Sequence, residues 1–186
     1  MNPQPVAGAP VSRARRKLLY AGAGLAAALA GAGVAWRRFQ PAEAPTTDAM
    51  AAFWTLSFDT PQGQTLAMES LRGKQLLINF WATWCPPCVE ELPLIESFYR
   101  ANAAKNWQVL ALAVDQPSAV RQFLGRVPVT FPVGLAGLGG TELGKSLGNL
   151  SGGLPFTVVV GADGTVRQRR MGRLTEHELT QWAAAS

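Results

Sequence analysis

Residues 79–93, which read NFWATWCPPCVEELP, constrain the fold of this chain more than any other stretch. They hold Cys85 and Cys88, the only two cysteines among 186 residues. The mostly apolar run QLLINF at 75–80 comes directly before them and has the length and composition of a strand buried on both faces. A helical pattern follows over 86–105. The cysteine pair is therefore expected where a buried strand meets a helix.

A C-x-x-C pair can be half of a zinc site, a structural disulfide or a redox centre. A structural zinc site needs four ligands. The chain offers two Cys and one His, His177, which is expected on a helix surface, so zinc would require a site shared between chains. A disulfide stabilises more when it closes a longer loop, and this pair closes a very short one. The pattern therefore favours a redox-active dithiol.

The position of the pair predicts a different role for each cysteine. A helix N-terminus stabilises a thiolate and lowers the pKa of the first cysteine. We expect Cys85 to be the exposed nucleophile and Cys88, one turn into the helix, to be the buried resolving thiol. Pro86 and Pro87 are tolerated in a first helical turn, but each removes an N–H that could stabilise the Cys85 thiolate. Strongly oxidising pairs have a stabilised reduced form. A less stabilised Cys85 thiolate therefore favours a pair that acts as a reductant.

The rest of the body alternates between strand and helix patterns. The Pro- and Gly-rich stretch 127–140 is expected to be mostly loop, and GADG at 161–164 a hairpin turn. Thr175, with Glu178 three residues on, has the pattern of a capping box. The order predicts an α/β fold with a mixed central sheet flanked by helices. The predicted strands are 53–58, 75–80, 107–114, 155–160 and 165–170, and the predicted helices are 86–105, 118–126, 141–147 and 175–184.

The positive charge of the chain is concentrated at its N-terminus. Residues 1–40 hold six Lys and Arg and no acid, whereas residues 41–186 hold 11 basic and 12 acidic residues. The net charge of +5 therefore does not give the body a basic face, which argues against nucleic-acid binding. The arginines near the C-terminus are expected along a solvated strand edge, where charges discourage edge pairing. They are Arg167, Arg169, Arg170 and Arg173.

The uncharged segment at 18–36 has the length of a membrane span. As a helix it would measure about 28 Å, close to the hydrocarbon thickness of a bilayer. Four basic residues precede it and two follow, which predicts the N-terminus inside and the body outside. We therefore expect a cytoplasmic stretch at 1–17, a transmembrane anchor at 18–36, a linker at 37–52 and a folded domain at 53–186.

A cleaved signal peptide is the alternative to an anchor. ALA at 28–30 and AGA at 30–32 both fit an A-x-A-like cleavage site. The sequence SRARRKLL at 12–19 loosely resembles a twin-arginine export signal, so both the Sec and the twin-arginine routes stay open. Either outcome places the body outside the cytoplasm.

Three stretches together resemble the membrane-anchored TlpA/ResA-type thiol-disulfide oxidoreductases of bacteria, which have a thioredoxin-like fold. They are NFWATWCPPC, the triplet ELP at 91–93, and GGLPFTVVVGADG at 152–164, and the resemblance covers about residues 50–184. It implies a periplasmic domain at the inner membrane that reduces disulfides of exported proteins, such as apocytochrome c or copper-site assembly proteins. It also implies a membrane electron donor of the DsbD or CcdA kind, a monomer and no cofactor.

The resemblance assigns residues to the substrate surface. It implies that Pro155 follows a cis peptide bond and faces the two cysteines. The backbone of Leu154 would then pair with an extended substrate peptide. Trp84 would cover one side of the pair, although packing in the core is an equally simple interpretation.

The resemblance also bears on proton transfer. Glu91 stands where the family carries a glutamate near the cysteines. It could accept a proton from Cys88 if burial raises its pKa; otherwise it is a solvated charge on the helix. Asn79 stands where thioredoxins carry a buried Asp, a departure shared with the TlpA/ResA-type group, and we expect it to be structural.

Two other functions stay open. A disulfide oxidase or isomerase uses the same chemistry, but the chain lacks room for a large helical insertion or a dimerisation domain. A copper(I)-binding chaperone would use the thiolates of Cys85 and Cys88 as ligands, without a nearby Met or His arranged to help.

Overall fold

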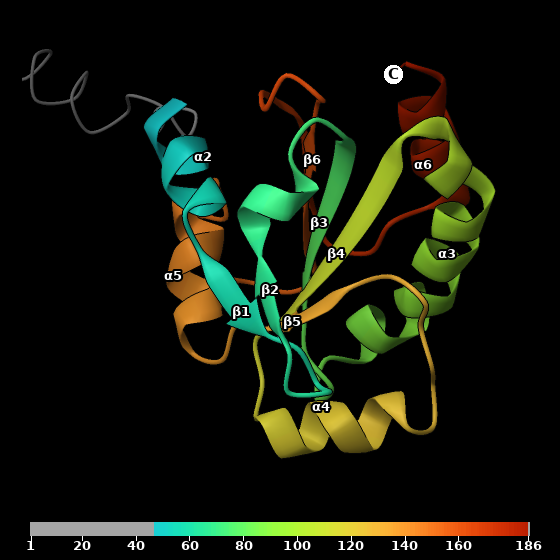
Figure 1. The fold of residues 1–186 in the computed structure, drawn as a ribbon. Helices are drawn as coiled ribbons and strands as arrows, with labels where there is room; N and C mark the ends of the chain where they lie inside the picture. The colour runs from blue at the N-terminus through green and yellow to red at the C-terminus, as the bar shows by residue number, and fades with distance from the viewer. Residues whose placement is uncertain (1–46, 186) are drawn as a thin grey trace, which may run out of the picture. The chain divides into compact units, whose positions relative to one another are not determined.

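The structure, a computed structural model, describes residues 47–185 as a seven-stranded sheet covered by helices (Figure 1). The strands are β1 (Ser57–Asp59), β2 (Thr65–Ala67), β3 (Gln75–Trp81), β4 (Trp107–Ala113), β5 (Val133–Leu135), β6 (Phe156–Val160) and β7 (Val166–Met171). The helices are α2 (Thr47–Trp54), α3 (Pro86–Asn102), α4 (Pro117–Leu124), α5 (Gly139–Ser146) and α6 (Glu176–Ala184). Two short 3₁₀ segments lie at Met68–Leu71 and Ala103–Lys105.

The strand order β2-β1-β5-β4-β3-β6-β7 places β3 and β4 near the centre of the sheet. β3 runs parallel to β4, and β4 parallel to β5. β6 runs antiparallel to β3, and β7 antiparallel to β6, so the sheet is mixed as predicted. Because parallel strands end at the same edge, the loop that leads from β3 to Cys85 leaves the sheet beside the carboxyl ends of β4 and β5.

Side chains of β3 alternate between two cores, one on each face of the sheet. Leu77 and Trp81 lie in the core under α3, α4 and α6, whereas Ile78 and Phe80 lie in the core under α2 and α5. Figure 1 shows α3 and α6 on one side of the sheet and α2 and α5 on the other. Asn79 falls between Leu77 and Trp81 in this alternation, so its amide faces the α3 side.

Strand β7 forms one edge of the sheet and carries arginines, as predicted. Arg167 pairs with Asp163 at 2.7 Å, and Arg170 pairs with Glu178 at 2.6 Å. The turn between β6 and β7 has Gly164 at φ +81°, a conformation that favours glycine. The charged side chains protect this edge from pairing with another sheet.

Helix α6 begins as predicted. The Thr175 side chain accepts the N–H of Glu178, and the Glu178 carboxylate accepts the N–H of Thr175, which completes the capping box. His177 is exposed on this helix, as expected.

The strand predicted at 53–58 is wrong. Helix α2 covers Thr47–Trp54, and the strand β1 starts only at Ser57. Met50 and Phe53 are buried in the core, so the folded body begins inside the stretch expected to be a linker. A short apolar run such as AAFW fits a helix and a strand equally well, and packing against the sheet decides between them.

The stretch 127–140 is mostly loop, as predicted, but two elements in it were not expected. It contains β5 and the first residues of α5. β5 pairs with β4 on one side and with β1 on the other. Pairing with two neighbours therefore makes this three-residue segment a strand despite its Pro- and Gly-rich surroundings.

None of the helices within residues 47–185 is long and apolar enough to cross a membrane. The anchor predicted at 18–36, together with the stretch 1–17, lies outside the described residues.

Candidate active site

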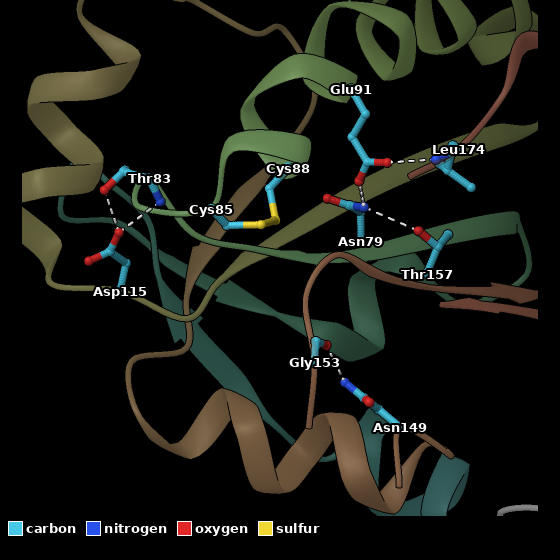
Figure 2. The surroundings of a disulfide bond; sticks show 10 residues. All are labelled: Asn79, Thr83, Cys85, Cys88, Glu91, Asp115, Asn149, Gly153, Thr157 and Leu174. Atoms are coloured by element: carbon cyan, nitrogen blue, oxygen red, sulfur yellow. Dashed lines mark hydrogen bonds between the residues drawn. A yellow bond between two sulfur atoms is a disulfide. The ribbon is translucent and has the colours of Figure 1, made fainter. Parts of the chain in front are cut away.

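Cys85 and Cys88 form a disulfide at the start of α3 (Figure 2). Cys85 is the N-cap of the helix, and Pro86 and Pro87 fill its first turn, as predicted. Cys88 is fully buried and Cys85 is 5% exposed, so the predicted order of exposure is correct. Cys85 is nevertheless far less exposed than expected, because it belongs with Cys88 to the core cluster beneath α3.

The backbone near Cys85 offers few N–H groups to its sulfur. Pro86 and Pro87 have no N–H. The N–H groups of Cys88 and Val89 both donate to the carbonyl oxygen of Cys85, at 3.0 and 3.1 Å. The first N–H groups of α3 are therefore either missing or already paired.

Glu91 lies one helical turn after Cys88 and is 0% exposed. Its carboxylate accepts the side-chain N–H of Asn79 at 2.7 Å and the backbone N–H of Leu174 at 2.8 Å. Burial raises the pKa of Glu91 above its ordinary value of 4.5; the two hydrogen bonds and nearby arginines act in the opposite direction without cancelling this effect. The interpretation of Glu91 as a solvated surface charge is therefore wrong.

The side chain of Asn79, on β3, bonds both to Glu91 on α3 and to Thr157 on β6. Besides donating to Glu91, its Nδ2 donates to the Oγ1 of Thr157 at 3.1 Å, and Thr157 is its partner across β3 and β6. Its Oδ1 is buried and has no hydrogen-bond partner within residues 47–185. The Nε1 of Trp81, two residues along β3, is also buried without a partner there. Buried polar atoms without partners are uncommon, and both face the α3 side of the sheet.

Asp115 holds the loop between β3 and α3. Its Oδ2 accepts the backbone N–H of Thr83 at 2.8 Å and also the Thr83 hydroxyl (Figure 2). Its Oδ1 accepts the N–H of Gln116 at 2.6 Å. Partial burial would raise the pKa of Asp115, but these hydrogen bonds outweigh it and lower that pKa. The contact ties two neighbouring strand ends together and fixes the segment that carries Trp84 and Cys85.

The loop before β6 is held by a buried side chain. Asn149 donates from Nδ2 to the carbonyl oxygen of Gly153 at 2.8 Å (Figure 2). The Leu154–Pro155 peptide bond is cis, as the family resemblance implied. Leu154 is half-buried and packs against both core clusters, one of which contains the two cysteines.

Trp84 is 66% exposed although it directly precedes the buried Cys85. Packing in the core is therefore excluded as its role. The indole therefore leaves a large apolar surface in contact with solvent next to the disulfide.

Several residues of this site were not predicted from the sequence, among them Thr83, Asp115, Asn149, Thr157 and Leu174. A signal for Asp115 was available, since an Asp directly after a buried strand meets the end of a parallel neighbour. Leu174 contributes only its backbone N–H, which no side-chain pattern encodes.

Comparisons with known proteins agree with this site. Residues 43–184 match the family model described as Redoxin. Thiol-disulfide oxidoreductase ResA of Bacillus cereus is 32% identical over 120 residues, which cover 63% of this chain and 66% of that protein. ResA of Bacillus thuringiensis subsp. konkukian is 30% identical over 122 residues, 65% of this chain and 68% of that protein. The match thus spans about two thirds of each relative's length.

A solved structure is also similar. The structure of MTB DsbF in its mixed oxidised and reduced forms has a TM-score of 0.62 and 28% identity, and covers 72% of this chain and 96% of that one. The mixed sheet, the helices on both faces and the disulfide at the start of α3 are therefore those of a thioredoxin-like α/β fold. The chain belongs to the Redoxin family and, within it, to the ResA type of thiol-disulfide oxidoreductases.

Proposed function

We propose that this chain is a protein-disulfide reductase that acts on exported proteins, with Cys85 and Cys88 as its redox pair. The main support is the position of their disulfide, at the first turn of α3 and one turn from the buried carboxyl of Glu91. A disulfide across three residues contributes little to stability. The position of this disulfide, near the buried carboxyl of Glu91 as a proton acceptor, instead supports a role in redox chemistry.

The reaction starts from the reduced pair and passes two electrons to the substrate. The Cys85 thiolate attacks one sulfur of the substrate disulfide, which forms a mixed disulfide and releases the other substrate sulfur as a thiolate. Cys88 then gives its proton to Glu91 and attacks the sulfur of Cys85. The second substrate sulfur leaves as a thiolate, and the protein is left with the Cys85–Cys88 disulfide.

Glu91 suits the second step because it lies one helical turn from Cys88 and is shielded from water. A general base works best when its pKa lies close to the working pH. Burial raises the pKa of Glu91, which brings this carboxyl closer to neutral pH than an ordinary glutamate.

The direction of electron flow follows from the surroundings of the Cys85 thiolate. Strongly oxidising pairs owe their potential to a stabilised reduced form. Pro86 and Pro87 supply no N–H, and the next two N–H groups bond to the Cys85 carbonyl. The thiolate therefore receives little backbone stabilisation, which supports a reducing pair over an oxidase or isomerase.

The substrate surface is proposed to include Trp84, Leu154 and Pro155. Trp84 is exposed beside Cys85, and Leu154 is half-buried against both core clusters, one of which holds the two cysteines. The backbone of Leu154 would pair with an extended substrate strand, with the indole of Trp84 packing on the same polypeptide.

We place this activity outside the cytoplasm, in the periplasm. Residues 18–36 would anchor the chain in the inner membrane, or be removed as a signal, with residues 37–46 as a linker. The substrates would be apocytochrome c or copper-site assembly proteins. A membrane electron donor of the DsbD or CcdA type would return electrons to a monomer that needs no cofactor.

The test uses the pre-reduced full chain and a peptide with an oxidised C-x-x-C-H sequence. Release of two peptide thiols for each chain oxidised is the expected result. The matched variant Cys88→Ser should stop at a mixed disulfide through Cys85, whereas Cys85→Ser should form none. Tight copper(I) binding without peptide reduction would replace the proposal with the copper-chaperone interpretation.

A further inference from the structure

The buried amide of Asn79 has one atom that the disulfide state leaves unpaired. Both oxygens of Glu91 accept hydrogen bonds, so Asn79 turns its Nδ2 toward that carboxylate. The second amide hydrogen goes to Thr157. Both hydrogens are then used, and Oδ1 is left without a partner within residues 47–185.

The unpaired oxygen lies on the cysteine side of the network. Asn79 belongs to the β3 face that packs on α3, and its bonded neighbour Glu91 sits one turn after Cys88 on that helix. Figure 2 shows the Asn79 oxygen on the side of the amide that faces the Cys85–Cys88 disulfide. A disulfide has no hydrogen to donate, which explains why this oxygen has no partner in the oxidised state.

Reduction supplies the missing donor, because each cysteine sulfur can then carry a proton. We propose that in the dithiol the S–H of Cys88 donates to the Oδ1 of Asn79, which makes Asn79 the positioning residue for the resolving thiol. The inference rests on the proposed role of Cys85 and Cys88 as the redox pair. Cys88 is the donor because it is fully buried, whereas Cys85 reacts as a thiolate and has no hydrogen to give.

The proposed contact affects the equilibrium between the two redox states. The disulfide state carries a buried oxygen without a hydrogen bond, which is unfavourable, and the dithiol satisfies it. Asn79→Leu has a similar volume and no oxygen, so the disulfide should become favoured by about tenfold over the parent. For a two-electron couple this is a change of about 30 mV toward a more negative potential.

Infrared spectroscopy of the full chain tests the contact directly. Cys85→Ser leaves Cys88 as the only thiol in the chain. Its S–H stretch should appear at the lowered frequency of a hydrogen-bonded thiol, and should move to the free-thiol frequency when Asn79→Leu is added. The matched control, Thr157→Val, disturbs the same network without removing the Asn79 oxygen and should keep the lowered frequency. The same frequency with and without Asn79→Leu would overturn the inference.

A second readout does not depend on the folding of a variant. In the unmutated chain, the carbonyl carbon resonance of the Asn79 side chain should shift between the oxidised and reduced states, and an unchanged resonance would also overturn the inference. A failure of the proposed function can be told apart from a failure of this contact, because it would appear as a lack of peptide reduction by the unmutated chain. A failure of the Asn79 contact would leave that reduction intact.

Discussion

The side chain of Asn79 donates a hydrogen bond to the carboxylate of Glu91 at 2.7 Å, and both residues are completely buried. The bond links β3 to helix α3, at whose start both cysteines lie. Thr157 and Leu174 complete the network from β6 and from the segment before α6. A carboxyl placed in a core in this way should affect both the stability and the chemistry of the protein.

Stability should depend on pH through Glu91. Its pKa is raised in the folded protein, so the stability that its neutral form contributes is fully present below about pH 4.5, the ordinary pKa, and is lost as the pH rises through the raised value. Glu91→Gln cannot titrate, so its free energy of unfolding should vary less over this window. Urea unfolding at a series of pH values measures the difference. An exposed glutamate on α5, across the sheet from this network, offers a control, Glu142→Gln, whose curve should follow that of the parent.

Glu91→Gln should also separate the two chemical steps. Loss of a general base typically slows a reaction by about 10²-fold or more, and here only the attack of Cys88 on the mixed disulfide should slow. The attack of Cys85 on the substrate should keep its rate. Rapid quenching of single turnovers resolves both steps. Equal slowing of both steps, or of neither, would argue against Glu91 as the proton acceptor.

Asp115 should be required to hold the segment before Cys85. Asp115→Ala leaves the N–H groups of Thr83 and Gln116 without their acceptor, and we expect a loss of about 1–2 kcal/mol in the free energy of unfolding. Thr83→Val removes only the hydroxyl contact and should cost less, about 0.5 kcal/mol. Denaturant unfolding measures both. A loss in Thr83→Val as large as that in Asp115→Ala would show that the backbone contact contributes nothing.

The central part of the fold could be predicted from local patterns. The runs at 75–80 and 107–114 are apolar over a full strand length, and they became β3 and β4. The capping box at Thr175 depends only on residues within one turn, and it is present. In contrast, α2 and β5 are short, and their states depend on packing and pairing with distant strands, which a local pattern does not contain.

The two cysteines of the candidate site could be predicted from the sequence, but the hydrogen bonds around them could not. The spacing of Cys85 and Cys88 pointed to the candidate redox pair, because that chemistry depends on neighbouring residues in the chain. Glu91 accepts a hydrogen bond from Leu174, 83 positions away, and Thr83 donates one to Asp115, 32 positions away. Such contacts follow from the order of the strands in the sheet. The sequence predicted a mixed sheet flanked by helices, but it did not predict that order.

Trp84 should matter for binding and not for folding. Its side chain is 66% exposed, so Trp84→Ala should change the free energy of unfolding by less than about 0.5 kcal/mol. The KM for a protein disulfide should rise, because an exposed apolar contact beside Cys85 is lost. Reaction with a small disulfide reagent, which cannot reach the indole and the sulfur together, provides the control and should be unchanged. An equal effect on both substrates would place the role of Trp84 in the reactivity of Cys85.

The decisive quantity is the reduction potential of the Cys85–Cys88 pair in the full chain, measured by equilibration with glutathione buffers. Few backbone N–H groups are available to stabilise the Cys85 thiolate, so we expect a value at or below about −270 mV, in the range of thioredoxin. Such a value would allow the pair to reduce disulfides of exported proteins. A value near about −120 mV, that of a strong oxidant, would contradict the proposed reductase and identify the chain as a donor of disulfides.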